Sequence, residues 1–136
     1  MLPWICSQHQ QTLQGHTATV RALAILRNKN TIFSASRDTT IRVWNIAKGT
    51  CIDVIAAHTG TVRSLTLSKA EDLLVSGGDD GTASIWRIAD NGLVRLHILN
   101  HCENGICHIA LLEDGRAQVA TAGFDGSLKI WDVEDG

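Results

Sequence analysis

The strongest constraint on the fold of this 136-residue chain is an internal repeat. A histidine, an aspartate and a tryptophan recur in the same order at intervals of 42 to 45 residues, and each aspartate stands six residues before its tryptophan. The histidines are His16, His58 and His101, the aspartates are Asp38, Asp80 and Asp125, and the tryptophans are Trp44, Trp86 and Trp131. A fixed period of this length is typical of architectures in which each repeat is one supersecondary unit.

Each unit has the pattern of short β-strands separated by tight turns. Alternating or β-branched apolar residues predict strands at 20–26, 31–34, 41–46 and 51–56, and again at 61–67, 73–76 and 83–88. The links SRDTT, GDDGT and GFDGS all have Asp, and the second and third also have Gly, where a tight hairpin needs them. No window shows sustained helical periodicity, so the sequence predicts an all-β fold.

These residues resemble a known family, the WD repeats of β-propellers. The resemblance rests on Gly15-His16 at the start of the first unit, the turn aspartates, and Trp131-Asp132 at the end of the third. It covers repeats at 12–46, 51–88 and 94–133, after an N-terminal segment at 1–11. The pattern drifts at four places, Ala57-His58, Asn100-His101, Trp44-Asn45 and Trp86-Arg87.

The resemblance implies a hydrogen-bonded tetrad in each blade, formed by the histidine, a strand Ser or Thr, the turn aspartate and the tryptophan. One Ser/Thr column supplies the hydroxyl in all three units. The implied tetrads are His16–Ser34–Asp38–Trp44, His58–Ser76–Asp80–Trp86 and His101–Thr121–Asp125–Trp131. Buried polar groups need partners, and a chain ending on a carboxylate supplies them. We therefore interpret these residues as structural and not as a catalytic triad.

The number of blades raises a question, because closed propellers have about four to eight. With a strand near residues 8–14, the chain holds twelve predicted strands, enough for three four-stranded blades if the first strand serves a neighbour. Two explanations stay open: the chain is a fragment of a longer propeller, or several copies assemble into one ring. Trp4 favours the fragment, because it stands twelve residues before His16 and resembles the remnant of a preceding repeat.

Composition and charge exclude several classes of protein. A hydrophobic content of 44% excludes wholesale disorder, and no apolar run approaches the length of a membrane span. Four cysteines without a signal peptide favour an intracellular protein, in cytoplasm or nucleus, with no membrane partner. Residues 1–69 carry a net charge of +6 and residues 70–136 a net charge of −8. The basic half lacks interleaved aromatic residues, which disfavours nucleic acid as the partner.

Enzyme and metal sites find little support. The nucleotide-binding and nucleophile motifs with fixed glycine spacing are absent, so we expect no catalytic residue, no cofactor and no enzymatic activity. Five potential zinc ligands crowd residues 97–108, but their spacing matches no established zinc pattern. They are His97, His101, Cys102, Cys107 and His108. We interpret them as a tetrad histidine with buried or surface neighbours, and predict no metal.

Three arginines are better candidates for a binding site than the cysteines and histidines. Arg21 and Arg63 occupy the same column of the first strand in consecutive units, and Arg37 precedes the turn aspartate. In a propeller these positions lie on one rim of the central channel, where clustered guanidinium groups can bind phosphate. The runs GHTATVR, SASRDTTIRVW and HTGTVRSL look like repeats of F-box/WD-repeat substrate receptors of SCF-type ubiquitin ligases. That resemblance implies that Arg21, Arg37 and Arg63 bind a phosphorylated peptide.

The same region departs from the receptor pattern. The third unit has Cys107 and Phe124 in the two arginine columns, Asp79 stands beside the expected pocket, and an F-box is absent. We therefore expect a non-catalytic scaffold that binds a protein or peptide partner. More specifically, we expect it to recognise a phosphopeptide. The ring would be closed by self-association or by the remainder of a longer propeller. The alternatives are a truncated or structural product without activity of its own and, less favoured, a metal-binding or enzymatic protein.

Overall fold

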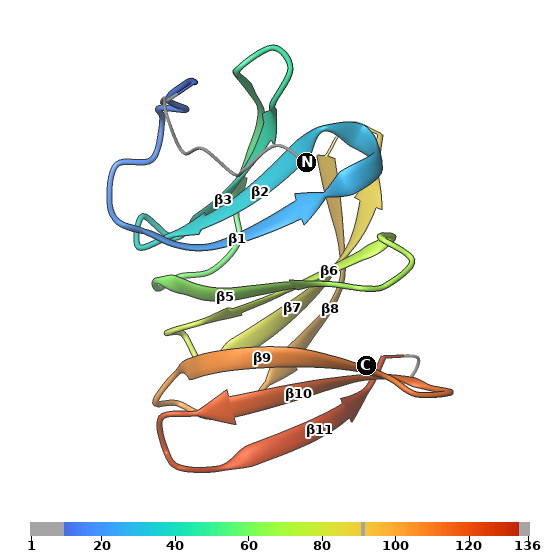
Figure 1. Ribbon diagram of the computed structural model, residues 1–136. Helices are drawn as coiled ribbons and strands as arrows, with labels where there is room; N and C mark the ends of the chain where they lie inside the picture. The colour runs from blue at the N-terminus through green and yellow to red at the C-terminus, as the bar shows by residue number, and fades with distance from the viewer. Residues whose placement is uncertain (1–9, 91, 134–136) are drawn as a thin grey trace, which may run out of the picture.

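The computed structural model describes residues 10–90 and 92–133, which form eleven β-strands in three antiparallel sheets (Figure 1). The first sheet holds β1 (Val20–Leu26), β2 (Thr31–Ser36), β3 (Thr40–Asn45) and β4 (Thr50–Ala56). The second holds β5 (Val62–Leu67), β6 (Leu73–Gly78), β7 (Thr82–Ala89) and β8 (Gly92–Asn100). The third holds β9 (Ile106–Glu113), β10 (Ala117–Gly123) and β11 (Leu128–Asp132). The prediction of an all-β fold is confirmed.

Helical structure is almost absent from these residues. A single turn of 3-10 helix, Arg27–Lys29, joins β1 to β2, and the described ranges contain no α-helix. Within them, no helix has the length and apolar character that crossing a membrane would take.

Every sheet is a meander, so strands that follow one another in the chain pair side by side. The sheets are arranged in chain order, with the second between the first and the third (Figure 1). Their first strands, β1, β5 and β9, are neighbours in space, and we refer to them as the inner strands. Because each sheet repeats the same strand order, equivalent residues of the three units line up along one edge of the molecule.

The turn between the second and third strands contains the repeated aspartate. Gly81 and Gly126 follow that aspartate in the second and third units, with φ angles of +80° and +84°. In the first unit Thr39 stands there with φ of 74°. This left-handed conformation suits glycine and strains a β-branched residue. The turn therefore has the same backbone geometry in all three units, and in the first unit Thr39 adopts it with backbone strain.

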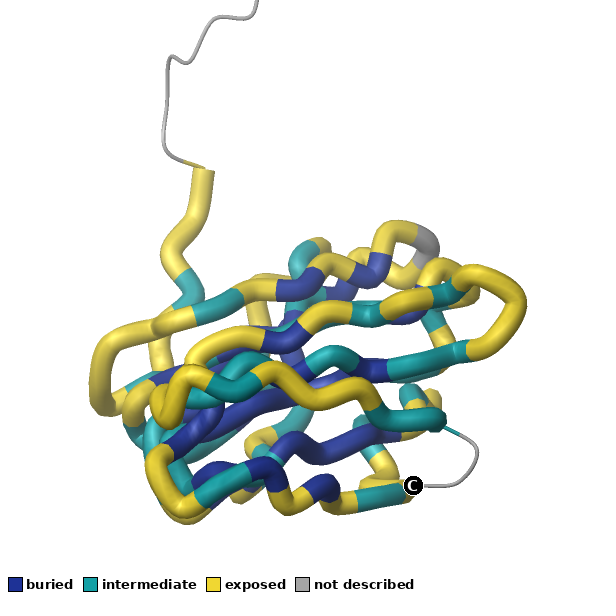
Figure 2. The backbone as a smooth tube through the Cα atoms, turned by 90° about the horizontal axis from the view of Figure 1, so that it is seen from below, coloured by how far each residue is buried: buried dark blue, intermediate teal, exposed yellow. Residues whose placement is uncertain are grey.

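Two apolar layers hold the sheets together. Between the first and second sheets lie residues such as Phe33, Ile41 and Leu74, all almost completely buried. Ile85, Ile106 and Val119 belong to the second layer, between the second and third sheets. The middle sheet is therefore covered on both faces. Figure 2 shows that buried residues are concentrated in the strands and exposed residues in the loops.

The described residues cover the outer faces of the first and third sheets only in part. Leu23 and Ile25 on β1 are 60% and 54% exposed, and Leu128 and Ile130 on β11 are 67% and 49% exposed. Side chains of this kind are buried where two sheets meet, as the middle sheet shows. Each outer face therefore has the apolar character of an unfinished sheet-to-sheet contact.

The third sheet differs from the expected four strands. In the first two sheets the outer strand follows the third strand in the chain, whereas the sequence-based count took an outer strand from residues 8–14. Residues 10–14 form no strand, and the third sheet ends at β11 among the described residues. Gln11 instead donates a side-chain hydrogen bond to the Ile46 carbonyl at 2.9 Å. Trp4 and most of the predicted segment 1–11 lie outside the described residues.

Candidate functional site

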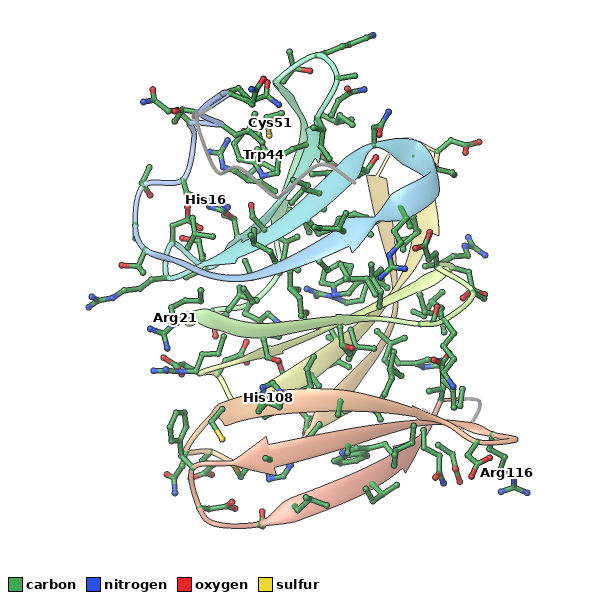
Figure 3. The ribbon with its side chains drawn as sticks, viewed as in Figure 1. His16, Arg21, Trp44, Cys51, His108 and Arg116 are labelled. Carbon is green, nitrogen blue, oxygen red and sulfur yellow. The ribbon has the colours of Figure 1, made fainter. Side chains whose placement is uncertain are left out.

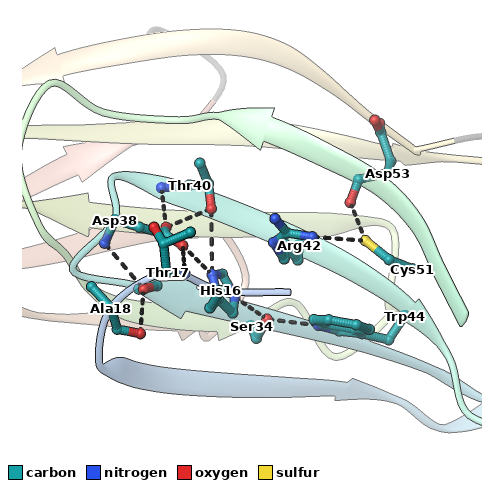
Figure 4. A network of polar contacts seen from close by, with 11 residues as sticks. His16, Thr17, Ala18, Ser34, Asp38, Thr40, Arg42, Trp44, Cys51 and Asp53 are labelled. Atoms are coloured by element: carbon teal, nitrogen blue, oxygen red, sulfur yellow. Dashed lines mark hydrogen bonds and ion pairs between the residues drawn. The ribbon is translucent and has the colours of Figure 1, made fainter. Parts of the chain in front are cut away.

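The first predicted tetrad is brought together at the outer face of the first sheet (Figure 4). Trp44 Nε1 donates to Ser34 Oγ at 2.7 Å, and Ser34 Oγ lies 2.6 Å from His16 Nε2. His16 Nδ1 lies 2.7 Å from Asp38 Oδ2. These distances fit one directed chain, in which the serine hydroxyl donates to Nε2 and the Nδ1–H donates to the carboxylate. Every donor of the chain then has an acceptor.

The carboxylate of Asp38 is the anchor of this network. The Thr40 hydroxyl donates to Oδ1 at 2.6 Å, and the Thr17 backbone N–H donates to Oδ2 at 3.1 Å. Burial alone would raise the pKa of Asp38, but the hydrogen bonds from Thr40, His16 and Thr17 outweigh it and hold that pKa well below its ordinary value. The side chains of His16 and Asp38 are only 6% and 7% exposed, so the charge is satisfied inside the protein.

The second tetrad repeats the first. Trp86 Nε1 donates to Ser76 Oγ at 2.9 Å, Ser76 Oγ lies 2.8 Å from His58 Nε2, and His58 Nδ1 lies 3.0 Å from Asp80 Oδ2. Burial is the main cause of a lowered pKa of His58, and it outweighs the opposing attraction of the Asp80 carboxylate. His58 is thus neutral near pH 7, and the residues again form a directed chain.

The third tetrad contains an additional link. Trp131 Nε1 donates to Thr121 Oγ1 at 2.9 Å, but here it is His101 Nδ1 that lies 2.6 Å from the threonine oxygen. His101 Nε2 lies 2.8 Å from Ser127 Oγ, which donates to Asp125 Oδ1 at 2.7 Å. The carboxylate itself is 3.7 Å from Nε2, beyond hydrogen-bond distance. The directed chain is preserved, with the proton of His101 on Nε2 instead of Nδ1.

Ser127 belongs to a second Ser/Thr column that the sequence analysis missed. The residue two positions after each turn aspartate carries a hydroxyl that donates to that aspartate. These residues are Thr40, Thr82 and Ser127. The expectation of a single Ser/Thr column was wrong, because the residues of these tight turns also supply hydroxyl groups that bind the aspartate. The recurring pattern Asp-x-Ser/Thr was the available signal.

The three predicted arginines line one hollow between the first and second sheets. This hollow, which we call the arginine cavity, has a volume of about 300 Å³ and is formed by Thr19, Arg21, Arg37, Thr61, Arg63 and Asp79. Arg21 and Arg63 come from the starts of β1 and β5, and Arg37 and Asp79 come from the turns after β2 and β6. Figure 3 shows Arg21 at the strand ends that bear this rim and Arg116 at the opposite ends.

Backbone hydrogen bonds fix the two turns against the inner strands. The Arg37 N–H donates to the Thr19 carbonyl, and the Asp79 N–H donates to the Thr61 carbonyl, both at 2.9 Å. The same bond recurs in the third unit, where the Phe124 N–H donates to the Gly105 carbonyl at 3.0 Å. The turn column at this rim therefore consists of Arg37, Asp79 and Phe124.

The arginines differ in their partners. Arg63 is held by two hydrogen bonds to the Asp79 carboxylate, one of them from Nη2 to Oδ2 at 3.2 Å, and its guanidinium carbon lies over the Phe124 ring, 4.9 Å from the ring centre. The hydrogen bond to Asp79 raises the pKa of Arg63 further. Arg21 and Arg37 are exposed and have no side-chain hydrogen bond or ion pair within the described ranges.

The potential zinc ligands of residues 97–108 do not gather as a set. In the described part of the chain, the donor atoms of His101, Cys102 and Asp125 lie within 4.8 Å of one another, and His97, Cys107 and His108 are not in that group. Both ring nitrogens of His101 already serve the third tetrad. The geometry assigns this histidine to the structural network.

Comparison with known proteins places the repeats in a family. The family model described as "WD domain, G-beta repeat" matches residues 7–45, 49–87 and 93–132. The solved structures named "Structure of U3-55K" and "Crystal structure of RRP9 WD40 repeats" each superpose on 92% of this chain with a TM-score of 0.81 and 24% identity. The chain covers 39% and 38% of those structures. This similarity shows the fold, a part of a β-propeller.

Curated relatives match over shorter stretches. The "Nuclear distribution protein nudF" of Aspergillus niger is 48% identical over 46 residues, 33% of this chain and 10% of the relative. The "Probable E3 ubiquitin ligase complex SCF subunit sconB" of Aspergillus clavatus is 50% identical over 40 residues, 29% of this chain and 6% of the relative. The "Pre-mRNA-processing factor 19" of Bos taurus is 39% identical over 46 residues, 34% of this chain and 9% of the relative. The chain thus spans a tenth or less of these proteins.

The family match covers most of the chain, and the structure repeats one set of strands and polar networks in three units. WD40 repeats are scaffolds for protein–protein interaction and in general are not catalytic. This chain is a member of the WD40 repeat family.

Proposed function

We propose that this chain is a non-catalytic interaction module that binds a phosphorylated peptide at the arginine cavity. The observation that carries the proposal is the convergence of Arg21, Arg37 and Arg63 from two sheets on one hollow. Guanidinium groups bind phosphate through paired, charge-assisted hydrogen bonds, and a cluster of them is a recurrent way of recognising phosphorylated residues.

Arg21 and Arg37 supply the free positive charge of this site. Both side chains are exposed, and neither has an acidic partner among the described residues. A phosphate ester carries a charge of about −1.5 to −2 at pH 7 and offers three acceptor oxygens. Two unpaired guanidinium groups from the same sheet can therefore neutralise one phosphate without breaking an existing ion pair.

The similarity to sconB supports this reading at the level of the repeat. That relative is named as a subunit of an SCF ubiquitin ligase complex. The relatives nudF and Pre-mRNA-processing factor 19 match equally short stretches and carry unrelated names. The proposal therefore depends on the arginine cavity itself, and the sconB similarity adds the class of partner, a protein presented to a ubiquitin ligase.

The test is a binding titration with a phosphoserine peptide library of degenerate flanks, compared with the same library without phosphate. We expect retention of the phosphorylated library, weakened about tenfold or more in Arg21→Ala and in Arg37→Ala. Arg116→Ala is the matched control, because it removes the same charge at the opposite strand ends (Figure 3). Equal binding of both libraries, or equal losses in all three variants, contradicts the proposal.

We also propose that further propeller blades cover the two exposed outer faces, supplied by a second copy of this chain or by the rest of a longer protein. Leu23 and Ile25 on one face, and Leu128 and Ile130 on the other, support a sheet-to-sheet contact at each. Light scattering on the purified chain tests this. A defined oligomer with cooperative unfolding indicates closure by copies, and a soluble monomer with cooperative unfolding argues against any need for closure.

A further inference from the structure

The charges of the arginine cavity are not all available to a ligand. Its lining contains three guanidinium groups and one carboxylate, a formal balance of +2. The positive charge is uneven, because Arg21 and Arg37 come from the first sheet and the Arg63–Asp79 ion pair comes from the second. One side of the cavity is cationic, and the other side is close to neutral.

Two contacts keep Arg63 in its pair. Both hydrogen bonds to Asp79 come from the guanidinium group, through Nε and Nη2, and its central carbon lies over the Phe124 ring. A bidentate pair fixes the direction of the guanidinium group, and the cation–π contact with the ring further favours this position. To reach a phosphate, Arg63 would have to leave Asp79, whose carboxylate would then face the same phosphate.

We infer that Asp79 restricts the arginine cavity to a single phosphate, so that a second phosphate close to the first adds no affinity. This inference rests on the proposed function and names the class of ligand, a singly phosphorylated segment. One phosphate dianion matches the +2 balance, and it lies on the Arg21–Arg37 side. A second phosphate would come to the Asp79 side, where Arg63 is already neutralised.

The residue spacing of an extended peptide would bring a second phosphate close to the first, where the cavity can discriminate against it. Residues i and i+2 of a strand point to the same side and are separated by about 6.6 Å. The screening length of physiological salt is about 8 Å, so Asp79 repels a second phosphate that comes to its side of the cavity within that distance, without full screening. Replacing Asp79 by asparagine removes the repulsion, frees Arg63 and raises the balance of the cavity to +3.

The experiment compares one short peptide with neutral flanks in three forms, unphosphorylated, with one phosphoserine, and with phosphoserines at positions i and i+2. Each is titrated into the full chain and into the isosteric variant Asp79→Asn. Asp90→Asn is the control, because the Asp90 side chain is 96% exposed and its one ion pair among the described residues is with Lys29. Thermal melts of all three proteins establish that they are folded to the same extent.

For the unmodified chain we expect the two phosphorylated peptides to bind within about twofold of each other, the statistical gain of a second phosphate. In Asp79→Asn the doubly phosphorylated peptide should bind about tenfold more tightly than the singly phosphorylated one, and in Asp90→Asn no change is expected. A tenfold preference for two phosphates in the unmodified chain, unaltered in Asp79→Asn, overturns this inference alone. Equal binding of all three peptides in every protein overturns the proposed function and this inference with it.

Discussion

Ser127 Oγ lies 2.8 Å from His101 Nε2, so in the third unit a serine hydroxyl occupies the place beside the histidine ring that the turn aspartate occupies in the other two units. In the first and second units the histidine reaches the carboxylate through Nδ1 directly. In the third, the serine hydroxyl joins the ring to Asp125. The histidine is therefore linked to the aspartate directly in two units and through a serine in the third. The contributions of these two arrangements to stability can be compared within one molecule.

We predict that Ser127→Ala lowers the free energy of unfolding by about 1–3 kcal/mol, the cost of leaving the buried Nε2–H of His101 without an acceptor. Thr82→Ala is the control, because His58 keeps its direct hydrogen bond to Asp80. We expect it to cost about 1 kcal/mol or less. Urea unfolding of both variants gives the comparison, and a loss in Thr82→Ala as large as that in Ser127→Ala would show that the serine link is not special.

His58 makes stability depend on pH. Burial lowers the pKa of His58 below its ordinary value of 6.5, so the unfolded chain binds a proton at a pH where the folded chain does not. The free energy of unfolding therefore rises with pH in this range, and it falls as pH is lowered through 6.5 towards the folded pKa. Asp80 also has a lowered pKa, but its ordinary value of 3.8 places its effect at lower pH.

The measurement is urea unfolding at several pH values between about 7.5 and about 5, in the unmodified chain and in His58→Gln. We expect the slope of unfolding free energy against pH to be smaller in His58→Gln. His108→Gln removes an exposed histidine on β9 and serves as the control. An unchanged slope in His58→Gln would mean that other groups cause the acid sensitivity.

Much of the local structure could be predicted because it depends on neighbouring residues. The strand expected at 20–26 is β1 with the same bounds, since apolar alternation and the following turn define both ends. The hydroxyl, aspartate and tryptophan of each unit could be grouped because the repeat holds their spacing constant, and the histidine precedes them in every unit. The orientation of the His101 ring could not be predicted, because it depends on Ser127 and Asp125 in a turn more than twenty residues away.

The arginine cavity, too, could be predicted only in part from the sequence. The repeat indicated that Arg21 and Arg63 occupy equivalent positions, and the structure places both at one hollow. It did not indicate that Arg63 contacts Phe124, because Phe124 lies in the turn after β10 of the third sheet, 61 positions further along the chain. Contacts between sheets depend on how the sheets pack, and a single sequence carries little information about that packing.

The turn at Thr39 offers a stabilising substitution. Thr39 has a φ of 74°, where Gly81 and Gly126 stand in the other units. Its backbone carbonyl accepts hydrogen bonds from Ala57 and His58, and these do not involve the side chain. We predict that Thr39→Gly raises the free energy of unfolding by about 1 kcal/mol, because the left-handed conformation costs a residue with a Cβ about that much.

Thr39→Ala is the matched control for this substitution. Alanine also removes the threonine hydroxyl and methyl groups but retains the Cβ, so most of the strain remains. A gain in stability for Thr39→Gly with little change for Thr39→Ala, measured by thermal and urea unfolding, supports the argument. Equal gains in both variants would mean that the threonine side chain, and not the backbone angle, is the source of the strain.

Gly77 lies at the contact between the middle and third sheets, where there is no room for a larger residue. A Cβ at this position would lie 2.9 Å from Ile106 Cγ2 and 3.0 Å from Ile109 Cγ2, and Ile106 is fully buried. We predict that Gly77→Ala lowers the free energy of unfolding by about 1–3 kcal/mol, the usual cost of overpacking a core. Because Ile106→Ala removes the clashing methyl group, the double variant should cost less than the sum of the two single variants, by about 1 kcal/mol. Strict additivity in this cycle would contradict a direct steric conflict, and would instead assign the loss to each site separately.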